Sequence, residues 1–306
     1  MAIAAGRIST VTTPSASYAL VDLATVKDEL SIKITDTSGD TSLNRAIASV
    51  SQIIADYCSA PYGPFVVEAL IDTFQFDRDA FPGLKFAGEN RIALERCPVL
   101  SVTSVTQTLP DGTTRALVAG TDYVLNPKQG ELTRMRCDGM ATRWETLPLA
   151  VVYVAGFGAL NTAEPHTVPA TAPYAVAVNN AAMFAFDQTA TYANGTALAA
   201  VAANPVAGQY TVSGAGSYTF AAADAGKGVL LSYASNAIPS SLVSYVLEII
   251  TSRWSSRGRD PALVQRETQG IGIEKFWFGS EPGQDGELPP RIQAALDNTY
   301  RPPRLR

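Results

Sequence analysis

The chain has 306 residues, of which 46% are hydrophobic and 17% charged, and its formal net charge is −5. This composition is typical of a folded globular protein, and the acidic balance argues against a general basic surface that wraps nucleic acid. Cys58, Cys97 and Cys137 lie far apart and show no CxxC spacing, which favours reduced thiols in the cytosol. We expect neither a signal peptide nor a membrane span, because no apolar run is long enough.

The first 58 residues predict an arm and two helices. Residues 1–17 are small, Ser/Thr-rich and aperiodic, so we expect a flexible arm. Residues 24–30 have the spacing of a short helix, capped by either Asp22 or Thr25. Residues 41–58 carry apolar side chains at steps of three and four and predict a longer helix.

Between residues 65 and 157 the hydrophobic period changes to two, which indicates β-strands. A Pro-Asp-Gly turn at 110–112 ends one of them, as expected for a glycine that accepts positive φ. The expected strands are 66–76, 90–94, 99–108, 122–125, 130–135 and 147–157.

Residues 159–237 differ from their surroundings. They are rich in alanine and contain only four charged residues, Glu164, Asp187, Asp224 and Lys227. Short alternating runs at 208–212, 216–220 and 228–234, separated by glycine turns, predict a small all-β module. This module interrupts the chain between a strand and a helix, so we interpret it as an insertion.

The stretch 238–257 predicts the most apolar helix of the chain. Pro239 suits its first turn, and Gly258 followed by Asp260-Pro261 ends it. Beyond it we expect a short strand or hairpin at 269–278, a Gly/Pro/acidic spacer, a short helix at 288–298 and a basic tail.

These elements predict an α+β fold with three main helices, antiparallel β-strands, an inserted all-β module and an extended C-terminal arm. The expected parts are a flexible arm at 1–17, a core domain formed by 18–158 plus 238–287, the inserted module at 159–237, and a C-terminal docking helix and tail at 288–306.

No set of residues assembles a recognisable active site. His166 is the only histidine, and neither a nucleophile elbow nor a phosphate-binding glycine loop is present. The loop 35–40 lacks the glutamate of a calcium loop, and Asp72, Asp77 and Asp79 are better explained as a solvated strand end than as a metal site. We therefore expect a protein that is not an enzyme and that has no cofactor and no metal.

The C-terminal residues carry the strongest functional signal. Two prolines separate Arg301 from Arg304, Arg306 follows, and arginine pairs with carboxylates in a fork-shaped geometry. This pattern favours a docking peptide over a merely solvated tail. The run Phe276, Trp277 and Phe278 is typical of a contact between subunits.

The order of several segments along the chain is informative. In sequence, they are Leu23-Ala-Thr-Val-Lys-Asp-Glu-Leu30, the helix ending at Tyr57-Cys58, Cys97-Pro-Val-Leu-Ser-Val-Thr-Ser-Val105, Asp122-Tyr-Val-Leu125, Val151-Val-Tyr-Val-Ala-Gly-Phe157, Ile238-Pro-Ser-Ser-Leu242 and Leu296-Asp-Asn-Thr-Tyr-Arg301. This order resembles that of tailed-phage head–tail connector (adaptor) proteins, which form a ring beneath the portal. The resemblance covers about residues 20–158 and 238–306, and the module at 159–237 departs from it.

The resemblance implies a structural protein of the virion, assembled in the host cytoplasm and located at the head–tail interface. Its implied partners are further copies of itself in a typically twelvefold ring, the portal protein above, and a stopper or tail-completion protein below. DNA would pass through the lumen as non-specific cargo, and no membrane is involved.

The resemblance also assigns roles to particular residues. The portal-docking residues are expected to be Arg291, Tyr300, Arg301, Arg304 and Arg306. Contacts between subunits are expected at Arg253, Arg257, Arg259, Phe276, Trp277 and Phe278.

One alternative comes from another functional class. The β-module with its Tyr, Asn and Gly turns is also compatible with a phage surface protein that binds a receptor or a carbohydrate.

Overall fold

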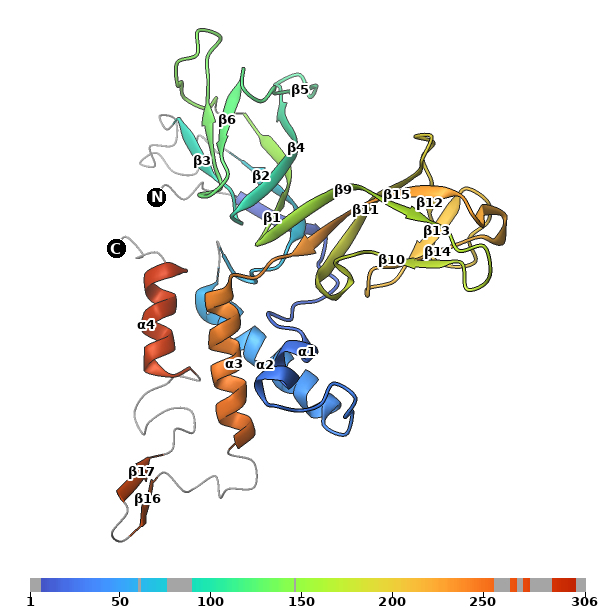
Figure 1. Cartoon of the computed structure of the whole chain (residues 1–306). Helices are drawn as coiled ribbons and strands as arrows, with labels where there is room; N and C mark the ends of the chain where they lie inside the picture. The colour runs from blue at the N-terminus through green and yellow to red at the C-terminus, as the bar shows by residue number, and fades with distance from the viewer. Residues whose placement is uncertain are drawn as a thin grey trace. The chain divides into compact units, whose positions relative to one another are not determined.

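The structure is a computed structural model, and it describes residues 7–59, 62–75, 90–145, 147–255, 265–268, 272–275 and 288–300. The chain divides into two compact units. The β unit comprises residues 1–17 and 65–237, and the helical unit comprises residues 18–64 and 238–306 (Figure 1). Helices and antiparallel strands occur in separate segments of the chain, which confirms the predicted α+β class.

The helical unit contains four α-helices: α1 (Leu23–Glu29), α2 (Asp40–Cys58), α3 (Ser240–Ser255) and α4 (Pro290–Thr299). Each follows its predicted range closely, because its apolar positions recur at helical spacing. Asp22 caps α1 by accepting from the backbone N of Thr25 at 2.8 Å, which decides between the two predicted caps. The same unit contains the antiparallel hairpin of β16 (Gln265–Thr268) and β17 (Gly272–Lys275).

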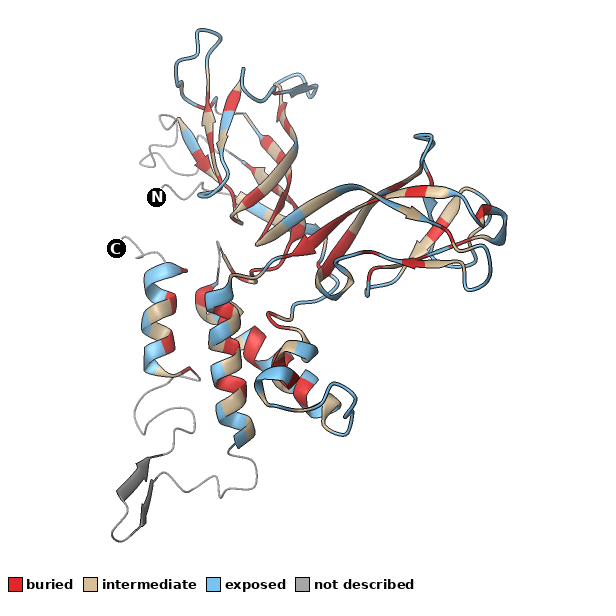
Figure 2. Cartoon of the chain, in the orientation of Figure 1, coloured by how far each residue is buried: buried red, intermediate tan, exposed pale blue. Residues whose placement is uncertain are grey.

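Each helix of this unit buries one face, as Figure 2 shows for α3 and α4. The hydrophobic residues buried at 3% exposure or less come from all four helices and from the segments before α1 and α4. Those in the helices and before α4 are Val26, Leu43, Ile47, Val50, Ile54, Cys58, Leu242, Val246, Ile249, Ile250, Leu288, Ile292 and Leu296, and Leu20 and Val21 precede α1.

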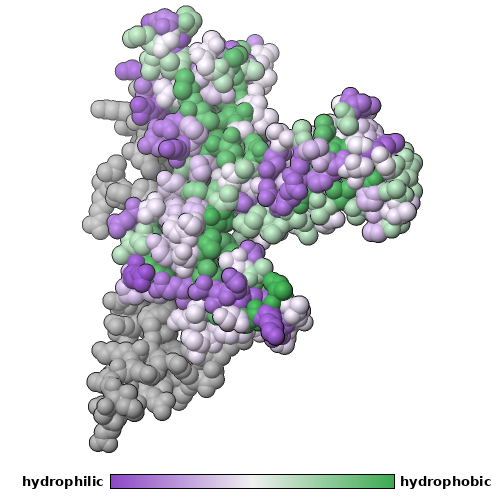
Figure 3. Space-filling view, viewed as in Figure 1, coloured by the Kyte–Doolittle hydropathy of each residue, from purple (hydrophilic) through white to green (hydrophobic). Residues whose placement is uncertain are grey.

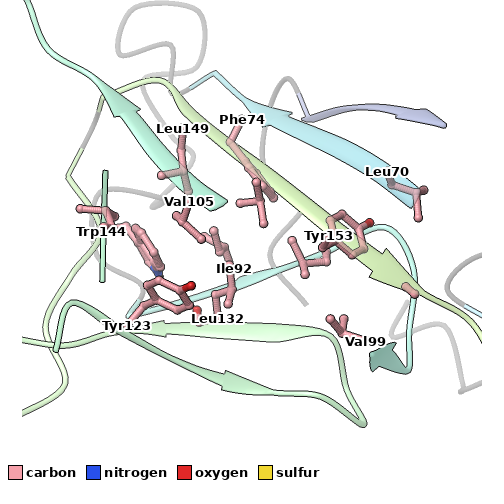
Figure 4. Packing of buried hydrophobic residues seen from close by; sticks show 14 residues of the cluster. Leu70, Phe74, Ile92, Val99, Val105, Tyr123, Leu132, Trp144, Leu149 and Tyr153 are labelled. Atoms are coloured by element: carbon pink, nitrogen blue, oxygen red, sulfur yellow. The ribbon is translucent and has the colours of Figure 1, made fainter. Parts of the chain in front are cut away.

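The β unit begins with two sheets that share one core. The first has the strand order β1-β2-β8-β4-β5, with β1 at Arg7–Thr13, β2 at Glu68–Phe74, β8 at Leu149–Ala155, β4 at Val99–Thr108 and β5 at Thr114–Ala116. The second has the order β3-β7-β6, with β3 at Arg91–Ala93, β7 at Glu131–Arg134 and β6 at Tyr123–Asn126. Alternate residues of both sheets, among them Leu70, Val105, Leu132 and Tyr153, point into the same apolar space (Figure 4).

Residues 158–236 form two further sheets. One has the order β11-β15-β9, with β11 at Phe184–Tyr192, β15 at Gly228–Asn236 and β9 at Gly158–Thr167. The other has the order β10-β14-β13-β12, with β10 at Ala175–Ala177, β14 at Ser217–Phe220, β13 at Gln209–Val212 and β12 at Ala199–Ala200. They enclose a second core rich in tyrosine and phenylalanine.

The path from β8 into β9 requires a glycine. Gly156 lies between these strands with φ +132°, and a Cβ atom there would lie 2.1 Å from the carbonyl oxygen of Val66. The start and end of the module meet at this point, where Asn236 accepts from the backbone N of Val67 at 2.8 Å and donates to Ser15 at 3.2 Å. The described contacts therefore group residues 159–237 with the sheets, whereas their origin as an insertion stays a prediction.

The expected flexible arm is wrong for residues 7–13. These residues form β1, which pairs with β2, because the run Ile8-Ser-Thr-Val-Thr-Thr13 is rich in β-branched residues. Strands β5, β9, β10, β11 and β12 were also not expected from the sequence, since none of them shows a clean apolar alternation.

Candidate assembly interface

Helix α4 is fixed to the rest of the helical unit along one face. Ile292 and Leu296 are fully buried, and Leu288, just before the helix, is 3% exposed. Pro290 begins the helix without loss of a hydrogen bond, since the first N–H groups of a helix have no intrahelical partner. The segment that was predicted as a docking helix is thus itself docked on its own chain.

The C-terminal end of α4 is held most firmly. The hydroxyl of Tyr300 lies 3.0 Å from that of Ser241 at the start of α3, and its ring packs edge-on against Tyr62 at 6.1 Å between centroids. Tyr57, in the last turn of α2, donates to Asp297 at 3.0 Å. Residue 300 therefore starts the following tail from a fixed position.

The predicted portal-docking residues fall into three groups. Arg291 is exposed over 81% of its side chain and has a long ion pair of 3.7 Å with Glu248, so it is available at the surface. Tyr300 is only 7% exposed, which gives it the position of an anchor for α4. Arg301, Arg304 and Arg306 lie outside the described residues.

The predicted subunit contacts lie on both sides of the β16–β17 hairpin in sequence. Arg253 is exposed in the last turn of α3. Arg257 and Arg259 follow it, and Phe276, Trp277 and Phe278 come directly after β17; these five residues lie outside the described part of the chain.

Oxygen atoms in and beside the loop 35–40, which lacks the glutamate of a calcium loop, bind the side-chain cation of Lys27. Lys27 is 2% exposed, and its ammonium group donates to the carbonyl oxygens of Asp36 at 2.8 Å and Ile34 at 3.4 Å. It also lies 2.5 Å from a carboxylate oxygen of Asp40. Lys27 therefore supplies the positive charge that these oxygens need.

Asp72, considered as a metal ligand in the sequence, has a structural role. It is fully buried, and its Oδ2 accepts from the backbone N of Glu95 at 2.7 Å and from the hydroxyl of Tyr153 at 3.0 Å. Burial raises the pKa of Asp72 above its ordinary value. Asp77 and Asp79 lie outside the described residues, among which no cluster of His, Cys, Asp or Glu could hold a metal ion.

All four charged residues of the 159–237 module bind side chains of the same module. Asp187 accepts from the hydroxyls of Tyr210 and Tyr218 at 2.5 and 2.7 Å. Asp224 accepts from Tyr192 at 2.6 Å and from Lys227 at 2.8 Å.

Glu164 completes this set. It accepts from Tyr233 at 2.7 Å and lies 2.5 Å from His166. Partial burial raises the pKa of Glu164, but hydrogen bonds from Tyr233, from the backbone N of Asn179 and from His166 outweigh it, so the pKa lies below its ordinary value.

Three tyrosines that donate to these carboxylates are buried. Tyr210, Tyr218 and Tyr233 are at most 2% exposed, so they form its core. The visible face of the module mixes apolar and hydrophilic residues (Figure 3). These three tyrosines are thus not available to a ligand, whereas Tyr174 and Tyr192 of the same module are partly exposed.

No family model matches the sequence, and no curated protein matches it. Among solved structures, a chain in the neck of an empty GTA particle is similar with a TM-score of 0.33 and 13% identity, over 49% of this chain and 71% of that one. A chain in the virion of a native gene transfer agent (GTA) particle has a TM-score of 0.30 and 15% identity, over 49% of this chain and 72% of that one. A chain in the neck of a native GTA particle has a TM-score of 0.30 and 19% identity, over 50% of this chain and 71% of that one.

None of the helices in the described part of the chain has the length and hydrophobicity that a membrane span requires.

Proposed function

We propose that the protein is a structural head–tail adaptor of a tailed phage or phage-like particle. In this proposal it forms a ring, typically of twelve copies, that joins the portal to a stopper or tail component and lets DNA pass. The proposal includes no catalytic step. It rests on the order of sequence segments given above and on one structural observation, the anchored end of α4.

The anchored helix is what a docking arm needs. Ile292, Leu296 and Tyr300 hold α4 in place, and the next six residues include three arginines. A tail that starts from a fixed point loses less conformational entropy on binding than one attached to a mobile segment. Its arginines suit carboxylates on a partner, because the guanidinium group binds them in a bidentate geometry.

The structure decides which variant best tests this role. Deletion of residues 288–306 would also remove α4 with its buried Ile292 and Leu296, and it would expose apolar residues of the helical unit. The better variant changes only the tail, as the triple substitution Arg301→Glu, Arg304→Glu and Arg306→Glu. The matched control is Arg45→Glu, Arg91→Glu and Arg143→Glu, which makes the same change in net charge at exposed positions.

The measurement is co-purification with the portal protein of the same particle, followed by a titration. If each arginine contributes at least about 1 kcal/mol, the tail variant should bind on the order of 100-fold more weakly. The control variant should bind like the unmodified chain. Equal binding of the tail variant and the unmodified chain would exclude the docking role.

A further inference from the structure

Strand β1 leaves a long edge of its sheet open. It has seven residues, and within the described part of the chain only β2 pairs with it. Five consecutive residues, Arg7 to Val11, pair with β2 in unbroken register. Ile8 is 58% exposed and Val11 is 39% exposed. Every second residue of such a strand directs its N–H and C=O groups away from the sheet, where another strand can bind them.

The other edges of the β unit are protected against strand addition. Strands β3, β5, β10 and β12 have three residues or fewer, and β6 has four. Strand β9 contains Pro165 and a left-handed residue, Ala163 with φ 54°. Strand β11 has two register irregularities, and Ala185 in it accepts from the backbone N of Ala16.

Strand β1 has none of these features along its first five residues. Its single charged residue is Arg7, whose guanidinium group binds Glu95 and the carbonyl oxygen of Ala93. Natural proteins shorten, bend, charge or cover exposed edges, because an open one recruits other strands. An unprotected edge in this chain is therefore best explained by a partner strand.

The β16–β17 hairpin could use a third strand. Its strands pair only with each other in the described part of the chain, and a two-stranded sheet is marginally stable in water. It is joined to α3 and α4 by residues 256–264 and 276–287. The shorter connection, nine residues long, can span at most about 30 Å when extended. A third strand would complete the hairpin as a sheet.

We propose that the β16–β17 hairpin of one copy adds to the open edge of β1 in a neighbouring copy. Strand addition uses main-chain hydrogen bonds, and the neutral residues after Arg7 place no like charge opposite the hairpin. The contact joins two different surfaces, so it can repeat from copy to copy and close into a ring. The choice of this arrangement over a symmetric β1–β1 pair rests on the proposed ring.

Disulfide trapping tests the contact directly. In a Cys137→Ser background, one affinity-tagged chain carries a cysteine in place of Ile8, Ser9, Thr10, Val11 or Thr12, so that both faces of the strand are covered. An untagged chain carries Glu267→Cys or Ile273→Cys, which lie opposite each other in the two hairpin strands. After mixing and oxidation at assembling concentrations, we expect a tagged–untagged disulfide dimer from at least one pair.

Three results would overturn the proposal. Cross-linking of the β1 variants among themselves would show a symmetric β1–β1 pair. Assembly without any β1–hairpin disulfide would place the subunit contact elsewhere. A chain that remains monomeric up to its solubility limit would have no such contact.

A charge on the edge provides a second test. Thr10→Lys at an exposed position of β1 should raise the concentration needed for assembly at least about tenfold, since a lysine on an edge opposes strand addition. Val124→Lys, at a 46% exposed position of edge strand β6, is the control and should assemble normally. Portal binding is measured separately, so failure of the tail experiment would leave this result unaffected.

Discussion

Asp72 and Asp224 are both fully buried carboxylates of the β unit, but their surroundings differ. Both oxygens of Asp224 accept hydrogen bonds, Oδ1 from Tyr192 and Lys227, and Oδ2 from the backbone N of Gly208 at 3.2 Å. For Asp72 only Oδ2 accepts, and Oδ1 is buried without a hydrogen-bond partner. The module thus satisfies its carboxylate completely, whereas the five-stranded sheet does so only in part.

The pKa values of the two groups move in opposite directions as a result. Burial raises the pKa of Asp72, and its hydrogen bonds do not compensate. Burial also raises that of Asp224, but bonds from Lys227 and Tyr192 outweigh it and leave the pKa below its ordinary value. The comparison shows that hydrogen bonds and a paired cation outweigh the burial of the carboxylate at Asp224 but not at Asp72.

This difference bears on what the module does. Its charged residues hold strands together, so they are not free to steer a charged partner. The charged groups proposed for docking lie in the helical unit and its tail.

The largest expected effect comes from the module. Asp224→Ala removes the acceptor of a tyrosine hydroxyl and a backbone N–H, and it should lower the free energy of unfolding by about 3 kcal/mol. Urea denaturation followed by near-UV circular dichroism reports this, because the module's core is rich in tyrosine. Asp111→Ala, in an exposed turn, is the control and should cost much less. Equal losses in the two variants would contradict the comparison.

An intermediate effect is expected from pH. Because the folded-state pKa of Asp224 is lowered, its stabilisation is present above the ordinary value of 3.8 and is lost as the pH falls through the folded-state pKa. The stability difference between the unmodified chain and Asp224→Asn should therefore shrink by about 1–2 kcal/mol on acidification from pH 7. A difference independent of pH would exclude the charged pair as its source.

Unfolding at alkaline pH tests the hydrogen-bond network of the module independently. Burial and the hydrogen bond to Glu164 raise the pKa of Tyr233 to about 12 from 10.0. A raised pKa contributes stability that is present below pH 10 and lost as the pH rises through 12. Tyr233→Phe should remove this part of the alkaline unfolding.

Helices and strands that depend on the spacing of nearby residues can be predicted from the sequence. All four helices, the β6–β7 hairpin and strands β2, β3, β4 and β8 follow from periods of 3.6 and 2 and from turn residues. The Asp22 cap was one of two alternatives, since both side chains stand at the right distance from the first turn. The proposed role of the tail likewise rests on residues that are close together in the sequence.

Contacts between distant residues could not be predicted in the same way. Asp187 meets two tyrosines from strands more than twenty residues away, and nothing in their spacing identifies the partners. Tyr300 stands beside an arginine-rich tail and was expected at a partner surface, yet its position four residues after Leu296 places it on the buried face of α4. In β1, five β-branched residues were the signal, but three of them are threonines, so the segment shows no clear apolar alternation.

The smallest effect is expected at Asp72, where the prediction concerns the carboxylate that is only partly satisfied by hydrogen bonds. Asp72→Asn keeps an oxygen that can accept from Glu95 and Tyr153, and it removes a charge that burial disfavours. The free energy of unfolding at pH 7 should therefore change by less than about 1 kcal/mol, and a gain is expected rather than a loss. Since the folded-state pKa of Asp72 is raised, any gain should fade as the pH drops through the folded-state pKa, and it should vanish below the ordinary value of 3.8, where the carboxyl is protonated in both states. Urea denaturation at pH 7 and at pH 4 measures both effects. A loss above about 2 kcal/mol at pH 7 would mean that the ionised carboxylate stabilises the five-stranded sheet as Asp224 stabilises the module.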